Sequence, residues 1–532
     1  MKLLKICLYM MALLSFSASL FCTNITKEEL FKKGLEFHKE KKYEEALPYF
    51  VQAAQAGCAT AQNGLGLYYK QGYGTDKDQQ QAFEWFYKAA KQDNKEGKYN
   101  LALIYLSGIE GEDGKKIGTD LLTEVANECH IEGSYKLAKC YEEGLGITKS
   151  LYFAKEYYIK AANKNYVKAF NKLGHFFLKE IARLKKESIR PNHNAIAQSH
   201  NQATIWFEKS ANKEDPEGLY NLAKLQPDHS YGRKPFELYE KAANKDYAPA
   251  QYKLGCRCSK DNYQTKAFEW FKKAADLGHT KAQFRTAECY HNGKGIKLNL
   301  EQAEKYYLLA AENNDSNSQI SLAELYEKGH GISIKKDKSK SLFWYEKAAT
   351  QGLLKAQLYL AKYYVGENNQ EQVLYWYEKA AQQSSAQAQY YLGRYSFEQN
   401  AHQKAFEWFS EMENSFLLDS FLQESERRFF YYVLATYYIK GEVTKKNEEK
   451  AVKYYELAKK NGSKKAQEVL SNINKDKLAQ EVKTFNSTLN IENHAQAAEF
   501  AQLFKEQENF ELASFCYEKA YKILLAENEG KN

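Results

Sequence analysis

Cysteine, histidine and paired carboxylates carry most protein chemistry, and in this chain they are scattered. The eleven histidines form no HExxH motif and no pair at the spacing of metal ligands. Cys256 and Cys258 flank Arg257 and are the one combination that resembles a metal or redox pair. Pairs such as Glu378-Lys379 fit a charged helix surface rather than an acid–base dyad. We therefore expect no enzyme activity, no catalytic residue, no metal ligand and no cofactor.

A short sequence phrase recurs along the chain, and it predicts the helices that carry these residues. AFEWFYKAAK at 82–91 reappears as WFEKSA from 206, LYEKAA from 238, WFKKAA from 270, and WYEKAA from 344 and 376. The first of the two small residues in this phrase lies at Ala53, Ala89, Val125, Ala161, Ser210, Ala242, Ala274, Ala310, Ala348, Ala380, Met412 and Leu457. A period in the thirties is typical of a solenoid of helical hairpins.

Two helices are predicted in each period. The repeated phrase places apolar residues at i, i+3, i+4, i+7 and i+8, which is one stripe of a helix. The preceding helix has its own stripe, as in Ala61-Leu65-Gly66-Tyr69. A glycine inside a helix costs about 1 kcal/mol, so its return at this position implies a steric reason. Cys258 takes the place of Tyr69 in its repeat, which predicts a packed thiol rather than a redox pair.

Gly-x-Gly loops join the two helices in the longer repeats, at GYGTDKD from 72, GLGITKS from 144, GKGIKLN from 293 and GHGISIKKDKS from 329. The first glycine suits a helix C-cap, and a following polar residue suits an N-cap. Because no strand pattern precedes these glycines, a phosphate-binding loop is excluded.

Together the two-helix unit, the small-Leu-Gly-Tyr stripe, the glycine loop and the W[FY]xKAA phrase resemble the Sel-1-like repeat, a longer relative of the tetratricopeptide repeat. The resemblance implies an all-α, right-handed superhelical solenoid of antiparallel hairpins. We expect about eleven such repeats over 58–470, an opening tetratricopeptide-like hairpin at 27–57 and a closing one at 494–526 after a polar helical spacer at 471–493. Insertions near 178–202 and 412–430 are expected to form loops.

The amino terminus predicts export. Residues 1–22 have a short basic start and an apolar stretch from Ile6 to Leu20, which is the pattern of a signal peptide. Lipidation at Cys22 and an uncleaved anchor are the alternatives. No later stretch is long and apolar enough to span a bilayer, so we expect a periplasmic or secreted protein.

Composition limits the partners that we expect. The net charge is +8 over 532 residues, and acids and bases alternate, which argues against a nucleic-acid surface. Nine irregularly spaced cysteines indicate no disulfide framework.

The resemblance implies a monomeric interaction scaffold, bacterial in origin, that holds a protein partner in the superhelix groove, in envelope assembly or host interaction. A cell-wall or carbohydrate-associated binding protein and a lumenal quality-control adaptor are the alternatives. Residues of the first helices such as Tyr68, Tyr363, Tyr391 and Tyr395 are candidate contacts, but the binding residues themselves stay unknown.

Overall fold

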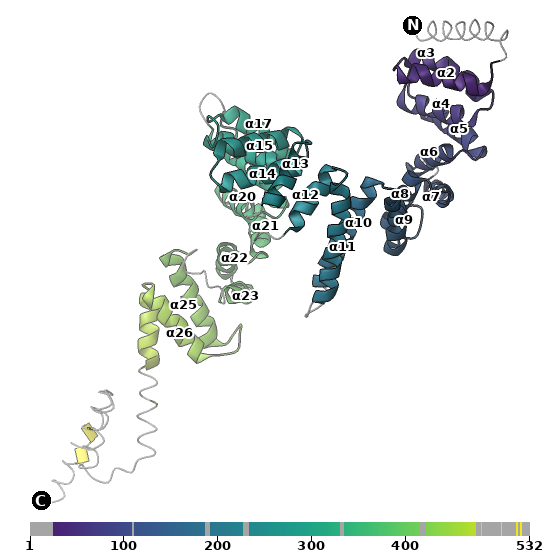
Figure 1. Ribbon diagram of the computed structural model, residues 1–532. Coiled ribbons are helices and arrows are strands. Elements are labelled where there is room, and N and C mark those ends of the chain that lie inside the picture. The colour runs from purple at the N-terminus through teal and green to yellow at the C-terminus, as the bar shows by residue number, and fades with distance from the viewer. Residues whose placement is uncertain are drawn as a thin grey trace, which may run out of the picture. The chain divides into compact units, whose positions relative to one another are not determined.

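The computed structural model describes residues 25–108, 111–186, 192–226, 233–329, 335–413 and 422–474, and a few isolated positions after them. All regular secondary structure within these ranges is α-helical (Figure 1). The predicted signal peptide at 1–22, the closing hairpin at 494–526 and most of the spacer at 471–493 lie outside the described residues or fall on isolated positions.

The helices alternate as first and second members of hairpins. The first members are α2 (Lys27–Lys39), α4 (Ala59–Gln71), α6 (Lys95–Leu106), α8 (Ile131–Glu143), α10 (Val167–Lys186), α12 (Pro216–Leu225), α14 (Ala248–Lys260), α16 (Thr280–Asn292), α18 (Ser316–Lys328), α20 (Leu354–Gly366), α22 (Ala386–Glu398) and α25 (Glu424–Lys440). The second members are α3 (Tyr43–Gln55), α5 (Gln79–Lys91), α7 (Gly111–Asn127), α9 (Leu151–Asn163), α11 (His193–Ala211), α13 (Arg233–Ala243), α15 (Gln264–Asp276), α17 (Leu300–Glu312), α19 (Lys338–Thr350), α21 (Gln370–Ala381), α23 (His402–Met412) and α26 (Glu448–Lys460).

In most hairpins the second helix packs on its own first helix and on the first helix of the next hairpin. The chain divides into two compact units. Unit 1 runs to Arg285 with residues 294–296, and unit 2 holds the remainder from Thr286. The expected α-solenoid class is confirmed. Helices α2 and α3 occupy the segment 27–57 that was predicted to open the array.

A close glycine–phenylalanine contact joins the two helices of several hairpins. A Cβ added to Gly66 would lie 2.6 Å from the ring of Phe86, and one added to Gly255 would lie 2.5 Å from the ring of Phe271. Gly174 with Phe207, and Gly393 with Phe409, repeat the arrangement. The steric reason expected for these glycines is therefore confirmed: the aromatic ring packs directly on the helix backbone.

Where the aromatic residue is tyrosine, alanine replaces the glycine. The equivalent pairs are Ala138 with Tyr158, Ala223 with Tyr239, Ala287 with Tyr307, Ala323 with Tyr345, Ala361 with Tyr377 and Ala435 with Tyr455. The tyrosine hydroxyl group can also form a hydrogen bond: that of Tyr158 donates one of 2.8 Å to the Glu142 carboxylate. The second aromatic residue of the phrase and the small residue of the first helix thus change together within this single chain.

Successive hairpins are also joined by a buried glutamine. Nε2 of Gln357 donates to the carbonyl of Ala349 at 3.1 Å, and its Oε1 accepts from Gln383 at 2.8 Å. Gln62 and Gln319 make the same pair of bonds in their own repeats. Each of these carbonyls, near the end of the preceding helix, also accepts a backbone N–H from the following turn. The glutamine therefore adds a second hydrogen bond, which orients the next hairpin.

The glycine loops cap helices as expected. Gly72 and Gly144 end α4 and α8 in the left-handed conformation, with φ of 77° and 78°. Asp78 and Ser150 then cap α5 and α9 through their side-chain oxygens. The loops are therefore structural elements that turn the chain into the second helix of each hairpin.

The first insertion differs from the expected loop. Most of the segment 178–202 lengthens two helices, so that α10 has 20 residues and α11 has 19. The apolar residues Leu178, Ile181 and Leu184 continue the helical spacing, which explains the extension. The two ends project beyond the neighbouring hairpins of unit 1 (Figure 1). In the second insertion, at 412–430, the residues from Glu424 onward belong to helix α25.

Candidate functional site

The first-helix face of unit 1, formed by α2, α4, α6, α8, α10, α12 and α14, contains a pocket at its amino-terminal end. The pocket has a volume of about 520 Å³ and lies mainly between α2 and α4. Its walls are apolar and aromatic, and include Phe31, Leu35 and Leu67. Tyr68 lies in its wall, and the Tyr68 hydroxyl is 2.8 Å from Nδ1 of His38.

Polar groups gather at one side of this pocket. Asn63, Asn94 and Glu96 belong to its lining. Oδ1 of Asn63 accepts a hydrogen bond of 2.9 Å from Asn100 on the next first helix. The Glu96 carboxylate lies 3.0 Å from Nε2 of His130 and is largely exposed. The pocket therefore combines an apolar interior with an amide and a carboxylate that neighbouring hairpins hold in place.

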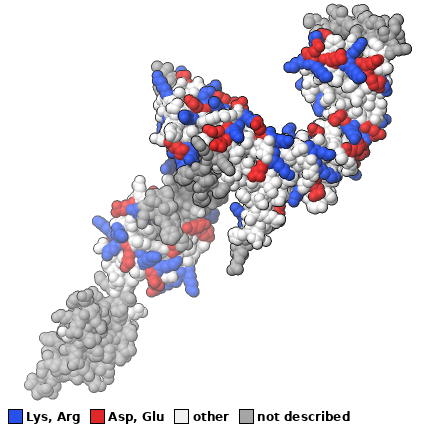
Figure 2. Space-filling model, viewed as in Figure 1, with Lys and Arg blue, Asp and Glu red and all other residues white. Residues whose placement is uncertain are grey.

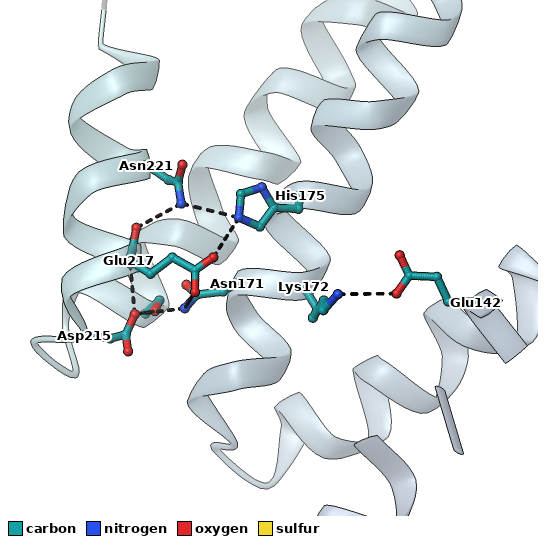
Figure 3. A network of polar contacts seen from close by, with 9 residues as sticks. Glu142, Asn171, Lys172, His175, Asp215, Glu217 and Asn221 are labelled. Atoms are coloured by element: carbon teal, nitrogen blue, oxygen red, sulfur yellow. Dashed lines mark hydrogen bonds and ion pairs between the residues drawn. The ribbon is translucent and has the colours of Figure 1, made fainter. Parts of the chain in front are cut away.

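Further along the same face, α10 and α12 share a network of polar side chains (Figure 3). Nδ2 of Asn171 donates to Asp215 at 2.8 Å and to Glu217 at 3.1 Å. The other Glu217 oxygen lies 2.9 Å from Nε2 of His175, and Asn221 donates to the Glu217 backbone carbonyl at 3.0 Å. Two carboxylates thus share one amide donor, which leaves this part of the face electronegative.

Tyrosines surround the network and remain protonated. Burial, with smaller contributions from nearby carboxylates including Glu217, raises the pKa of Tyr135 and of Tyr247 to about 12. Burial raises the pKa of Tyr99 to about 12 as well. These phenol groups are therefore neutral at physiological pH and can donate hydrogen bonds.

The four tyrosines singled out in the sequence are placed differently from one another. Tyr68 is buried and contributes to the pocket wall. Tyr363, Tyr391 and Tyr395 are half-buried in unit 2. Lys338 lies 4.6 Å from the Tyr363 ring, and Tyr391 stacks on Tyr377 at 4.1 Å. The structure brings none of the other three into the pocket beside Tyr68.

Sequence reasoning missed the polar residues of this face. Asn63 and Asn171 follow the small residue of their first helices by two positions, and Asn100 and Asn221 follow it by three. The stacking of successive first helices brings these positions together, as the hydrogen bond from Asn100 to Asn63 shows. The recurrence of asparagine next to the core stripe of the first helices was the sequence signal that could have indicated these residues.

The suspected chemical pairs have structural roles. Cys256 and Cys258 are half-buried on α14, and burial raises the pKa of Cys258, which disfavours a reactive thiolate. Cys140 and Cys289 are buried in the core. Within the described ranges, no three His, Cys, Asp or Glu side chains converge as ligands of a metal ion would.

Basic and acidic side chains of the described residues alternate over both units on the face drawn in Figure 2. Among the helices that the structure describes, none has the combination of length and apolar character needed to cross a bilayer.

Stacked helix hairpins that leave an open first-helix face define a repeat protein of the α-solenoid class, whose members present extended binding surfaces. The Sel1 repeat model matches residues 59–94, 131–166, 194–215, 233–247, 248–279, 280–315, 316–353, 354–385, 386–412 and 430–463. These segments make up more than half of the chain, which belongs to the Sel1 repeat family. Such proteins generally mediate protein–protein interaction and are generally not catalytic. The model skips 95–130, where α6 and α7 nevertheless pair.

The chain is also similar to solved structures of repeat proteins. The chain is 23% identical to c5321, a protective antigen of uropathogenic Escherichia coli with an SLR fold, over 90% of each chain with a TM-score of 0.47. A Sel1 repeat protein from Oxalobacter formigenes is 19% identical, over 73% of this chain and 89% of its own, with a TM-score of 0.29. A comparison with curated proteins gives no match.

Proposed function

We propose that the first-helix face of unit 1 binds an extended segment of a partner protein, and that the pocket between α2 and α4 takes an apolar side chain of that segment. The observation that carries this proposal is the pocket itself. Its volume of about 520 Å³ lies in the range of ligand sites, and its walls are apolar with polar groups at one side.

The polar groups suit a peptide backbone. Because Asn100 donates to Oδ1 of Asn63, the Asn63 amide nitrogen is turned toward other acceptors, and peptide carbonyls are such acceptors. A side chain fixed by its neighbour loses little conformational freedom when it binds. An extended peptide exposes the carbonyl groups that such an amide needs.

The carboxylates further along the face suit a cationic partner residue. Glu217 and Asp215 share the Asn171 amide, and Glu217 is 40% exposed at its side chain. The half-buried phenol groups of Tyr135 and Tyr247 interact with Glu217, and aromatic faces also attract cations. The preferred segment therefore has an apolar residue for the pocket, and a lysine or arginine further along.

Panning the full-length chain against a random peptide library tests this function. Enriched peptides should share an aromatic or aliphatic residue and a basic residue some distance away. The Leu67→Gln variant should weaken their binding about tenfold, because it places an amide in the apolar pocket. Leu309→Gln is the matched control, since Leu309 is a partly exposed leucine of α17 and lies outside the pocket.

Two results would count against the proposal. Enriched peptides without an apolar residue would contradict the role of the pocket, and equal losses in the Leu67 and Leu309 variants would contradict its location. Binding to peptidoglycan or glycans, with no peptide enriched, would instead support the carbohydrate alternative.

Export is the second part of the proposal, and residues 1–22 support it through their basic start and apolar stretch. An exported scaffold would meet its partner in the cell envelope or in a host. Mass spectrometry of the amino terminus of the protein from its native source tests this. A mature chain that begins shortly after residue 22 is expected, and an intact Met1 would contradict it.

A further inference from the structure

Three exposed apolar residues begin helix α9. Leu151 is 51% exposed, Tyr152 is 69% exposed and Phe153 is 48% exposed. They follow the helix cap Ser150 directly and occupy the first turn of the helix. Large apolar side chains that gather on an exposed surface usually mark an interaction site.

The same turn is polar in the other long repeats. Helix α5 begins with Gln79-Gln80-Gln81, α19 with Lys338-Ser339-Lys340 and α26 with Glu448-Glu449-Lys450, while α17 begins with Leu300-Glu301-Gln302. Apart from Leu300 of α17, these helices have polar residues at all of these positions, and each of them forms. Packing therefore does not demand the apolar triplet of α9.

The exposed residues continue into a row of aromatic rings. The ring centroids of Tyr152 and Phe153 lie 5.4 Å apart, and those of Phe153 and Tyr141 lie 5.3 Å apart. Tyr141 in turn stacks on Tyr157 at 5.7 Å. These ring contacts hold the side chains of Tyr152 and Phe153 in place at the surface.

Helix α10 continues past this turn and ends in basic residues. Lys155 of α9 lies 4.8 Å from the ring of Phe177 of α10. Because α9 and α10 run in opposite directions, the start of α9 points the same way as the end of α10. The last turn of α10 carries Arg183, Lys185 and Lys186.

The charges around the triplet are mostly positive. Lys149 precedes the helix and is exposed, and the first turn of α9 contains no acidic residue. The acidic residues nearby are Glu142 and Glu143 at the end of α8, Glu156, one turn further into α9, and Glu180, which lies 3.6 Å from Arg183. Glu142 is paired with Lys172 and Lys179, and Glu143 with Lys139. Basic residues therefore outnumber acidic residues around the exposed triplet.

We propose that the first turn of α9, residues 151–153, together with the basic end of α10, docks on the surface of an anionic lipid bilayer. Leucine, tyrosine and phenylalanine enter the interface between headgroups and acyl chains, while lysine and arginine remain beside the lipid phosphates. The triplet protrudes from a helix start, and a bilayer needs no complementary pocket. Anionic headgroups also match the local charge.

Docking would be peripheral, since no helix that the structure describes could span the bilayer. The docking residues lie on the second helix of a hairpin and on an extended helix end, and they include none of the residues that line the pocket. A scaffold held in this way keeps its pocket open to a partner.

The test uses the full-length chain and vesicles of equimolar phosphatidylcholine and phosphatidylglycerol. Amide hydrogen exchange, followed by mass spectrometry, should show protection of the first turn of α9 when vesicles are added. The amides of Leu151 and Tyr152 are suited to this measurement, because the first amides of a helix have no acceptor within it. The readout is local, so binding by the apolar residues 1–22 does not obscure it.

Replacement of the triplet by Leu151→Gln, Tyr152→Gln and Phe153→Gln gives α9 the first turn of α5, which folds in this chain. This variant should lose about tenfold in partitioning to the vesicles, since the buried apolar area is removed. Lys185→Glu with Lys186→Glu should lose about fivefold for each lysine at low salt. The matched control is Phe343→Gln with Tyr375→Gln, which removes two aromatic residues of similar exposure in unit 2 and should change nothing.

The proposal is overturned if vesicles leave the exchange of the first turn unchanged, or if pure phosphatidylcholine protects it equally well. It is also overturned if the Gln variant partitions like the wild-type chain. Protection by polyglutamate but not by vesicles would replace the bilayer with an acidic protein as the partner of this surface.

Discussion

The contact between Gly255 and Phe271 predicts a large cost for one added methyl group. A Cβ at position 255 would lie 2.5 Å from Cδ1 and 2.6 Å from Cε1 of the Phe271 ring. Carbon atoms pack favourably at about 3.5–4.0 Å. The ring therefore has to move by about 1 Å, and Phe271 is only 3% exposed, so it has little room to move.

The magnitude follows from two opposing effects. Overpacking of this kind costs about 1–3 kcal/mol. Alanine in a helix interior is favoured over glycine by about 1 kcal/mol. The Gly255→Ala variant should therefore lose up to about 2 kcal/mol of local stability, although the same change stabilises an ordinary helix.

Two further variants isolate the steric effect. In a Phe271→Leu background the clash is absent, and Gly255→Ala should stabilise α14 by about 1 kcal/mol. The pair Ala102 and Leu122, which takes the equivalent positions in α6 and α7, shows that this combination packs in the same chain. Gly366→Ala is the control without a clash, since no atom lies within 4 Å of a Cβ added there.

Native-state hydrogen exchange of α14 and α15 measures these effects locally, which matters because a repeat array need not unfold in one step. The four chains of the cycle should show a coupling energy of about 1–3 kcal/mol between positions 255 and 271. Equal effects of Gly255→Ala in both backgrounds would refute the reasoning.

Three further outcomes are expected. Gln357→Leu should cost about 1–3 kcal/mol by hydrogen exchange, and Gln251→Leu should cost less, because its Oε1 is already buried without a partner. Although burial raises the pKa of Glu413, hydrogen bonds from Lys450, Tyr454 and Tyr438 outweigh it and lower that pKa. Its stabilisation is thus full above the unfolded value of about 4.3 and is lost as pH falls through the folded pKa, so Glu413→Gln should flatten the acid limb of an unfolding profile. Maleimide should label the exposed Cys129 and spare Cys140, where burial raises the pKa to about 11, as peptide mass mapping will show.

The architecture could be predicted because packing requirements repeat. Gly66 and Phe86 satisfy the same steric condition as Gly255 and Phe271, so the pattern is present several times in one sequence. The capping residues repeat for the same reason, as with Gly72 and Gly144. A requirement that returns in every hairpin can be recognised without a second sequence.

Features that occur once could not be predicted in the same way. The segment 178–202 has no second copy, and its length suggested a loop until the spacing of Leu178, Ile181 and Leu184 is considered. The pocket depends on side chains from several helices, among them Phe31 and Leu67, and on the orientation of each. Such a site follows from three-dimensional placement and leaves no periodic signal.

First-helix residues that core packing does not fix indicate what kind of partner the first-helix face binds. Within each first helix, the core stripe is fixed by packing, but the residue after the glycine or alanine faces away from that seam. From α2 to α14 this residue is, in order, Leu35, Leu67, Leu103, Lys139, His175, Lys224 and Cys256. The first-helix face therefore changes from apolar near the pocket to polar toward α12, where Glu217 and Asp215 add their carboxylates. A segment that matches this order is apolar at one end and charged at the other, so it binds in one direction only. Reversing the sequence of an enriched peptide should accordingly abolish its binding, while a composition-matched segment in the forward direction should retain it.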